Sequence, residues 1–166
     1  MSVYHEALQA NRAYASSFGA ASLPMRPRKN LAVLACMDAR LTIEPMLGLA
    51  TGDAHIIRNA GGIATDDALR SLIISRRLQG ADTVFVINHT DCGMLALNEN
   101  EFRERLQTET GADASTLALH SFSDLETNVR AQVRRIESDP FVGGDAAVHG
   151  FIFDVTTGRL KAVSTN

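Results

Sequence analysis

The sequence predicts a single α/β domain with a mostly parallel central sheet, flanked by helices and ending in an antiparallel edge strand. Two runs rich in apolar residues, 31–35 and 82–87, have the pattern of parallel strands covered on both faces. Helical patterns alternate with these runs, which favours right-handed crossovers between parallel strands. The 166 residues fit one domain. We expect a helical arm and connector over residues 1–28 and an α/β core over residues 29–166.

The first half of the chain predicts an arm, two strands and a helix. Apolar residues within 3–14 have a loosely helical spacing, and two prolines then end regular structure. After the first apolar run, a shorter strand is expected at residues 55–57. Thr65 is an N-cap candidate, followed by two acidic residues, an apolar stripe and Gly80, so we expect a helix between these two positions.

The second half predicts another helix and a hairpin. The helix is expected to open at Ser123, where Glu126 would complete a capping box, and to end before Pro140. Two strands are expected over residues 151–155 and 160–163, joined by a short turn that contains glycine. This hairpin makes the last strand antiparallel to its neighbour.

Composition argues against several classes of partner. Sixteen Lys and Arg residues against nineteen Asp and Glu residues give a net charge of −3 without any block of like charges, so a nucleic-acid surface is not supported. No apolar stretch approaches the ~18 residues of a membrane span, and His5 and Glu6 stand where a signal peptide needs apolar residues. We therefore expect a cytoplasmic protein whose partner is a small molecule or another protein, with neither nucleic acid nor membrane involved.

Chemically reactive residues follow both apolar runs, where the predicted strands end. Cys36 comes directly after the first run, and His89 and Cys92 come after the second. Ligands of open α/β sheets gather at the carboxyl edge, so these three side chains converge if the strands are neighbours. Two thiolates and one imidazole suit tetrahedral zinc, and the open fourth position is the arrangement that zinc catalysis needs. The alternative is two buried thiols and a core histidine, but the paired occurrence favours metal.

Two charged residues accompany the first cysteine. Asp38 and Arg40 lie two and four residues beyond Cys36, so both can point into the same pocket. An arginine can hold a carboxylate by two parallel hydrogen bonds, and such a carboxylate stays ionised and can orient a zinc-bound hydroxide. The alternative is a surface ion pair that contributes ~0 to 1 kcal/mol. Spacing alone favours neither.

Taken together, these segments resemble the β-class carbonic anhydrase family. The order and separation of residues 36–40, 58–62 and 89–93 match that family, and residues 150–160 are similar to its final hairpin. The resemblance covers nearly the whole chain. It implies hydration of carbon dioxide to bicarbonate by attack of a zinc-bound hydroxide.

The resemblance also implies roles for individual residues and an assembly. The implied residues are the zinc ligands Cys36, His89 and Cys92, the catalytic pair Asp38 and Arg40, and the pocket glycines Gly61 and Gly62. A closed, inactive form is implied in which the aspartate itself ligates zinc. A homodimer or higher oligomer is implied as well, with the N-terminal helix of one subunit lying over its neighbour.

The choice of substrate stays open at this point. Short members of the family include hydrolases of carbonyl sulfide and carbon disulfide that share the ligands and the Asp and Arg pair. Met37 and Ala39 stand where many members carry small hydroxyl residues, which leaves the shape of the pocket undecided. A further hypothesis is a zinc or redox sensor that reports through Cys36 and Cys92 without turnover.

Two residues within the matching segments have structural alternatives. Thr90 can cap a helix that begins near Cys92. Arg58 is expected to pair with a carboxylate near the subunit interface. The histidines His5, His55, His120 and His149 show no ligand spacing with one another.

Overall fold

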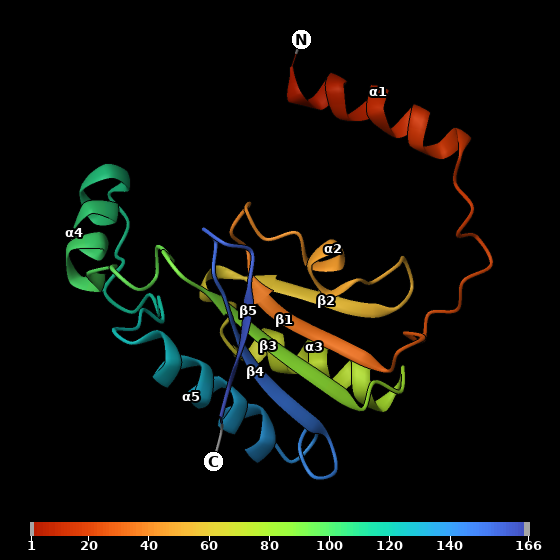
Figure 1. The fold of residues 1–166 in the computed structure, drawn as a ribbon. Coiled ribbons are helices and arrows are strands. Elements are labelled where there is room, and N and C mark those ends of the chain that lie inside the picture. The colour runs from red at the N-terminus through yellow and green to blue at the C-terminus, as the bar shows by residue number, and fades with distance from the viewer. Residues whose placement is uncertain (1, 165–166) are drawn as a thin grey trace.

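The computed structural model describes residues 2–164, which contain one five-stranded sheet of strand order β2-β1-β3-β4-β5. Its strands are β1 (Leu31–Cys36), β2 (Ala54–Asn59), β3 (Thr83–His89), β4 (Ala147–Phe153) and β5 (Leu160–Val163). The first four strands run parallel, and β5 pairs antiparallel with β4 (Figure 1). The predicted fold class is confirmed.

Residues 2–164 also form five α-helices and one short 3-10 helix, of which α1 precedes the first strand and the others lie between strands. They are α1 (Val3–Ser16), α2 (Ile43–Leu47), η1 (Ala60–Gly62), α3 (Asp66–Arg77), α4 (Glu99–Thr110) and α5 (Leu125–Ser138). Helices α1, α3 and α5 were predicted, and Thr65 caps α3 by accepting from the Ala68 N–H. Helices α2 and α4 were not predicted, because α2 has only 5 residues and α4 buries none of its described side chains. No helix among residues 2–164 is long and apolar enough to cross a membrane.

The start of α5 differs from the prediction by one residue. Asp124, not Ser123, is the N-cap, and its Oδ1 accepts from the Thr127 N–H at 2.7 Å. Glu126 accepts from Arg130 at 2.5 Å instead of completing a capping box. The expected box is therefore wrong, because the carboxylate of Asp124 already satisfies a free N–H of the first turn.

The proposed helix near Cys92 is also wrong. Residues 90–98 form turns and irregular backbone up to the start of α4. Thr90 uses its hydroxyl oxygen to accept from the Val155 N–H at 3.1 Å, which ties the end of β3 to the hairpin.

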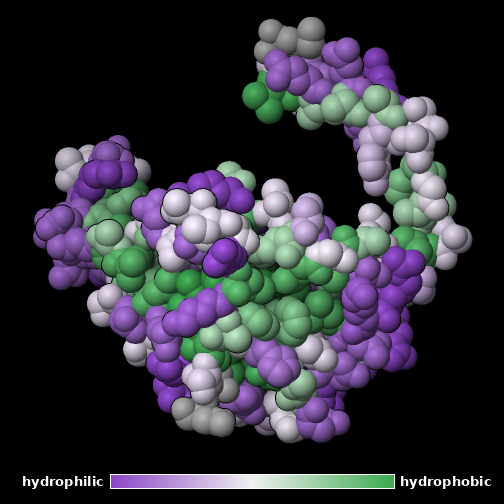
Figure 2. Space-filling view, viewed as in Figure 1, coloured by the Kyte–Doolittle hydropathy of each residue, from purple (hydrophilic) through white to green (hydrophobic). Residues whose placement is uncertain are grey.

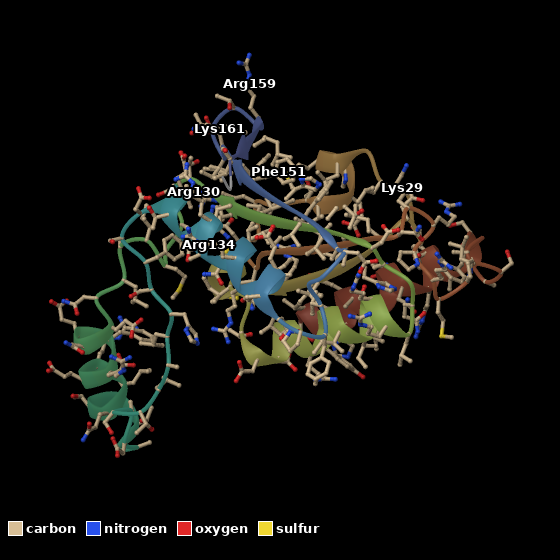
Figure 3. The ribbon with its side chains drawn as sticks, turned by 90° about the horizontal axis from the view of Figure 1, so that it is seen from below. Lys29, Arg130, Arg134, Phe151, Arg159 and Lys161 are labelled. Carbon is tan, nitrogen blue, oxygen red and sulfur yellow. The ribbon has the colours of Figure 1, made fainter. Side chains whose placement is uncertain are left out.

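The two faces of the sheet are covered unequally. Helices α3 and α5 pack on one face and bury a core that includes Leu34, Leu72 and Val133. The other face carries α2 and surrounding loops, and leaves Phe85 and Phe151 only partly buried. Figure 3 shows Phe151 on the side of the sheet that faces away from α3 and α5. The expectation of helices over both faces holds fully for one face alone.

Helix α1 lies apart from the core. It buries none of its described side chains, and a connector with Met25 exposed joins it to β1 (Figure 1). Its exposed apolar residues include Val3, Tyr4, Leu8 and Tyr14. Figure 2 shows a band of hydrophobic residues across the middle of the core, and α1 does not cover it.

Candidate metal centre

Two neighbouring parallel strands end at the same edge of the sheet and place three side chains together. Cys36 is the last residue of β1, His89 is the last residue of β3, and Cys92 follows in the turn after β3. Their ligand atoms all lie within 4.8 Å of one another, and all three residues are buried. The structure therefore brings together the three residues that the sequence singled out.

The protonation and burial of this cluster suit a metal ion. His89 Nδ1 lies 2.8 Å from the carbonyl oxygen of Thr90, so Nδ1 carries a proton, and in the neutral imidazole Nε2 has a free lone pair. That Nε2 is buried without a hydrogen-bond partner among residues 2–164. Both cysteines are free thiols. Two sulfurs and one imidazole nitrogen are a donor set for tetrahedral zinc, and a metal would satisfy the unpartnered nitrogen.

The two cysteines differ in acidity. Burial raises the pKa of the Cys36 thiol, whereas the adjacent His89 imidazole and backbone hydrogen bonds lower it, and the net value is about 7. The backbone groups that lower it belong to Asp38 and Gly61. Burial raises the pKa of Cys92. A Cys36 thiolate is therefore available near neutral pH, and thiolate is the form that binds metal.

Asp38 and Arg40 form a two-pronged ion pair beside the cluster. Arg40 Nε donates to Asp38 Oδ1 at 2.9 Å, and Nη2 donates to Oδ2 at 2.8 Å. These bonds, with one from the Arg40 backbone N–H, hold the pKa of Asp38 well below its usual range. Asp38 Oδ2 lies 3.8 Å from His89 Nε2. An ionised carboxylate thus borders the cluster, with both of its oxygens turned toward Arg40.

Asp91 holds the other side of the Arg40 guanidinium. Arg40 Nη1 donates to Asp91 Oδ2 at 2.8 Å, and Nη2 donates to the Asp91 carbonyl oxygen at 3.0 Å. Asp91 has left-handed backbone, with φ of 55°. Sequence reasoning gave this residue no role, and its place directly before Cys92 was the only available signal.

Arg58 supports the loop backbone and pairs with no carboxylate among the described residues of its own chain. Its Nε donates to the Cys36 carbonyl oxygen at 2.9 Å, and its Nη2 donates to the Asp38 carbonyl oxygen at 2.6 Å. The ion pair expected near the subunit interface stays a prediction. Arg58 stands beside Ala35 in the β1–β2 register, so strand pairing places its guanidinium where the loop after β1 begins.

Gly61 and Gly62 bring the turn after β2 against the cluster. Their φ angles are 80° and 63°, in the left-handed region that favours glycine. A Cβ on Gly62 would lie 3.0 Å from the Cys36 backbone nitrogen and 2.8 Å from Asn88 Nδ2. Close approach of backbone to the Cys36 strand therefore requires glycine at position 62.

A largely apolar cavity of about 460 Å³ lies next to these segments. It is lined by Asn59, Ala60, Thr65, Gly93, Met94, Leu97, Phe102, Ala118, Leu119 and His120. Ala60 directly precedes Gly61, and Gly93 directly follows Cys92. The cavity thus borders both turns that form the cluster.

A parallel α/β sheet with a Cys, His and Cys cluster at its carboxyl edge defines an α/β metalloprotein, and comparison with known proteins narrows this class. A family model described as carbonic anhydrase matches residues 31–160. The chain is 46% identical over 164 residues to a protein named beta-carbonic anhydrase 1 from Mycobacterium tuberculosis, covering 99% of each. It is 32% identical to a carbon disulfide hydrolase from Acidithiobacillus thiooxidans, covering 81% of this chain and 72% of that protein.

Solved structures agree with the sequence relatives. A carbonic anhydrase from Streptococcus mutans superposes with a TM-score of 0.94 at 41% identity, covering 99% of each chain. One from Glaciozyma antarctica superposes with a TM-score of 0.92 at 38% identity, covering 99% of this chain and 100% of that chain. The chain belongs to the β-carbonic anhydrase family.

Proposed function

We propose that this chain is a zinc-dependent carbonic anhydrase that hydrates carbon dioxide to bicarbonate. The observation that carries the proposal is the buried Cys36, His89 and Cys92 cluster, with an unpartnered His89 Nε2, beside the ion pair of Asp38 and Arg40. The full-length similarity to a protein named beta-carbonic anhydrase 1 supports it.

In this proposal Cys36, His89 and Cys92 hold the zinc ion. When bound, zinc would act as a Lewis acid that lowers the pKa of water. The effect would be weaker than at a site of three histidines, because two thiolates neutralise the charge of the ion. Asp38 stays ionised because Arg40 donates to both carboxylate oxygens. Its role is to accept a hydrogen bond from the reacting water and to direct the oxygen lone pair at the carbon of the substrate.

The polarity of the surroundings fits an uncharged, linear substrate. Most residues that line the cavity of about 460 Å³ are apolar. Carbon dioxide forms only weak hydrogen bonds with water, so its transfer into an apolar cavity costs little free energy. We propose that Gly61 and Gly62 form the part of the pocket wall nearest to Cys36. Their lack of side chains keeps space open on that side.

A second candidate is hydrolysis of carbonyl sulfide or carbon disulfide by the same residues, with release of hydrogen sulfide. The observation that favours it is the 32% identity to a carbon disulfide hydrolase. Both reactions attack an electrophilic central carbon, so the geometry of Asp38 and Arg40 serves either one.

The experiment compares kcat/KM for carbon dioxide hydration, carbonyl sulfide hydrolysis and carbon disulfide hydrolysis on zinc-loaded protein at one alkaline pH. We expect carbon dioxide to dominate. Dominant sulfide release would replace the proposed reaction by the second candidate while keeping the residue roles. Zinc well below one ion per chain, with a reversible disulfide between Cys36 and Cys92, would contradict both and favour a redox sensor.

We further propose a homodimer or higher oligomer in the cytoplasm. Helix α1 exposes apolar residues and buries none of its described side chains within its own chain, which suits a second copy as the surface that it covers. Two free, buried thiols suit a reducing compartment. Fractionation of cells with an antibody against the protein tests the compartment, and detection outside the cytoplasm would contradict it.

A further inference from the structure

Three buried amide side chains link helix α5 to strand β3. Asn88 on β3 is 1% exposed, and Asn128 and Gln132 on α5 are each 8% exposed. Asn128 Nδ2 donates to Asn88 Oδ1 at 2.7 Å, and Gln132 Nε2 donates to Asn128 Oδ1 at 2.8 Å. We call Asn88, Asn128 and Gln132 the amide bridge. None of them takes part in the chemistry proposed above.

Both ends of the amide bridge attach to the turn after β2. Asn88 Nδ2 donates to the Gly61 carbonyl oxygen at 2.8 Å. Gln132 Oε1 accepts from the Ala64 N–H at 2.9 Å. The bridge therefore fixes residues 61–64 from two sides, and it spans from α5 through β3 to do so.

The two ends dictate the direction of every hydrogen bond in the bridge. The Gly61 carbonyl can only accept and the Ala64 N–H can only donate, so each amide group has one orientation that satisfies its neighbours. Buried polar chains of this kind are fully satisfied only when every member is present. Removing one amide therefore disturbs the turn even when the change is distant from it.

The turn held by the bridge contacts the metal cluster directly. The backbone of Gly61 is among the groups that lower the pKa of the Cys36 thiol, and the carbonyl of the same residue is held by Asn88. Gly62 is so close that a Cβ there would lie 3.0 Å from the Cys36 nitrogen. Movement of this turn therefore moves the backbone of Gly61 and Gly62 relative to Cys36.

We propose that the amide bridge positions the Gly61 N–H against the Cys36 sulfur and thereby tunes how strongly that thiolate donates to the bound metal. Asn88, Asn128 and Gln132 are positioning residues that act through Gly61. A hydrogen bond to a thiolate ligand withdraws electron density from sulfur, and such outer partners typically change metal affinity or activity by about 10 to 100-fold. The inference rests on the proposed function, because it concerns the same zinc site.

The test uses Gln132→Met. This substitution removes both hydrogen bonds of the bridge residue that is farthest from Gly61, and the new side chain has nearly the volume of glutamine. Gln107→Met on the exposed face of α4 is the matched control. In the metal-free protein, we expect hydrogen exchange at the Gly61 N–H to speed at least about tenfold, while amides in β1 and β3 keep their wild-type rates. With Co²⁺ in the site, the thiolate-to-metal charge-transfer band should move to lower energy, because a thiolate that loses a hydrogen bond donates more strongly to the metal.

Unchanged Gly61 exchange and an unchanged Co²⁺ band in a folded Gln132→Met protein would overturn the inference. Equal acceleration at Gly61 and in the strands would overturn it too, since that pattern means general loss of stability. If Gln132→Met does not fold, Gln132→Glu keeps the acceptor for Ala64 and loses only the donor, with Gln107→Glu as its control and the same readouts. Failure of the wild-type chain to bind zinc would instead refute the proposed function, and Gly61 exchange would still decide whether the bridge positions the turn.

Discussion

Asp38 illustrates how one side chain is prepared for chemistry by its partners. Arg40 donates from its side chain to both carboxylate oxygens, and Arg58 binds the backbone carbonyl of the same aspartate. The carboxylate is therefore held ionised and in one orientation. Its neighbour Asp91 contacts Arg40 from the far side and has an exposed side chain.

Replacing Asp38 by Asn should leave zinc content unchanged and lower kcat/KM for carbon dioxide by about 10²- to 10⁴-fold, because an amide is uncharged and has an NH2 donor in place of one of the two accepting oxygens. Metal analysis and stopped-flow hydration assays measure the two quantities. Asp91→Asn is the matched control, since it also removes a partner of Arg40 but keeps the Asp38 fork, and its loss should be smaller. Full activity of Asp38→Asn would remove the assigned role.

Gly62 allows a second comparison at the scale of one residue. Gly62 and Gly158 have φ of 63° and 70°, so Ala is strained at both positions. A Cβ at position 62 would lie 3.0 Å from the Cys36 nitrogen, whereas a Cβ at position 158 would have no described atom within 4 Å. Gly62→Ala should therefore lower the free energy of unfolding by about 1–3 kcal/mol more than Gly158→Ala, and should also weaken zinc binding. Urea unfolding and chelator competition check this, and equal losses for the two variants would contradict the steric argument.

At the scale of elements, helix α3 is defined by its own sequence. Thr65 accepts from the Ala68 N–H at 3.3 Å, Asp66 and Asp67 fill the first turn, and Arg76 and Arg77 end the helix. These are the signals that the helix dipole and free N–H groups favour. The element was predicted because all of them are local.

The cap of α3 can be tested against that of α2. Thr65→Ala should cost about 0.5–2 kcal/mol in the free energy of unfolding, because a first-turn N–H loses its partner. Thr42 is the N-cap of α2 but makes no side-chain cap hydrogen bond to any described residue, so Thr42→Ala should stay within about 0.5 kcal/mol of the wild-type value. Thermal and urea unfolding measure both, and an equal cost would mean that the Thr65 bond is not what stabilises α3.

The carboxylate of Asp53 holds the connector and the start of β2 together. Asp53 accepts from the Ala50 N–H at 2.9 Å and from Arg28 Nε at 3.0 Å, and these contacts lower its pKa. Because the folded pKa is below the unfolded value of about 3.9, this contribution to stability is full above that value and is lost as the pH falls through the folded pKa.

Asp53→Asn should therefore flatten the decline in stability of the metal-free protein as the pH is lowered from about 5 to about 3. The amide cannot lose a charge over that range, so part of the acid sensitivity disappears. Urea unfolding at several pH values measures the slope for both proteins. Parallel slopes would show that Asp53 contributes nothing to acid unfolding.

At the scale of the whole molecule, the fold leaves two surfaces that one chain does not cover. Helix α1 stands away from the core, and the sheet face with Phe85 and Phe151 is only partly buried. Folded chains rarely leave surfaces of this kind to solvent, and association of two copies would cover them.

We expect the protein to sediment as a dimer or larger species. Leu8→Glu places a charge on the apolar side of α1 and should shift the equilibrium toward monomer by at least about tenfold in dissociation constant, whereas Gln9→Glu on the same helix should not. Analytical ultracentrifugation over a range of concentrations measures both. A monomeric wild-type protein would contradict the proposed assembly.

The sequence by itself determined that five strands form, three of the helices and the chemistry at the strand ends. The strand expected at residues 151–155 is β4, which begins four residues earlier, at Ala147. Apolar runs, caps and turn residues are local signals, and Cys36, His89 and Cys92 stand out because reactive groups follow buried runs. The motif segments also identified the family. The starting residue of α5 was missed because two adjacent side chains could each cap it, and α2 and α4 were missed because neither has a clear apolar stripe.

Only the tertiary structure decided which distant groups support the site. The contact of Arg58 with the Cys36 carbonyl depends on the β1–β2 register, and the amide bridge joins residues 88, 128 and 132 to the turn at 61–64. The partly exposed sheet face likewise follows from the placement of whole helices. Such contacts join residues that are far apart in the chain, and they exist only once strand order and helix packing bring those residues within hydrogen-bonding distance.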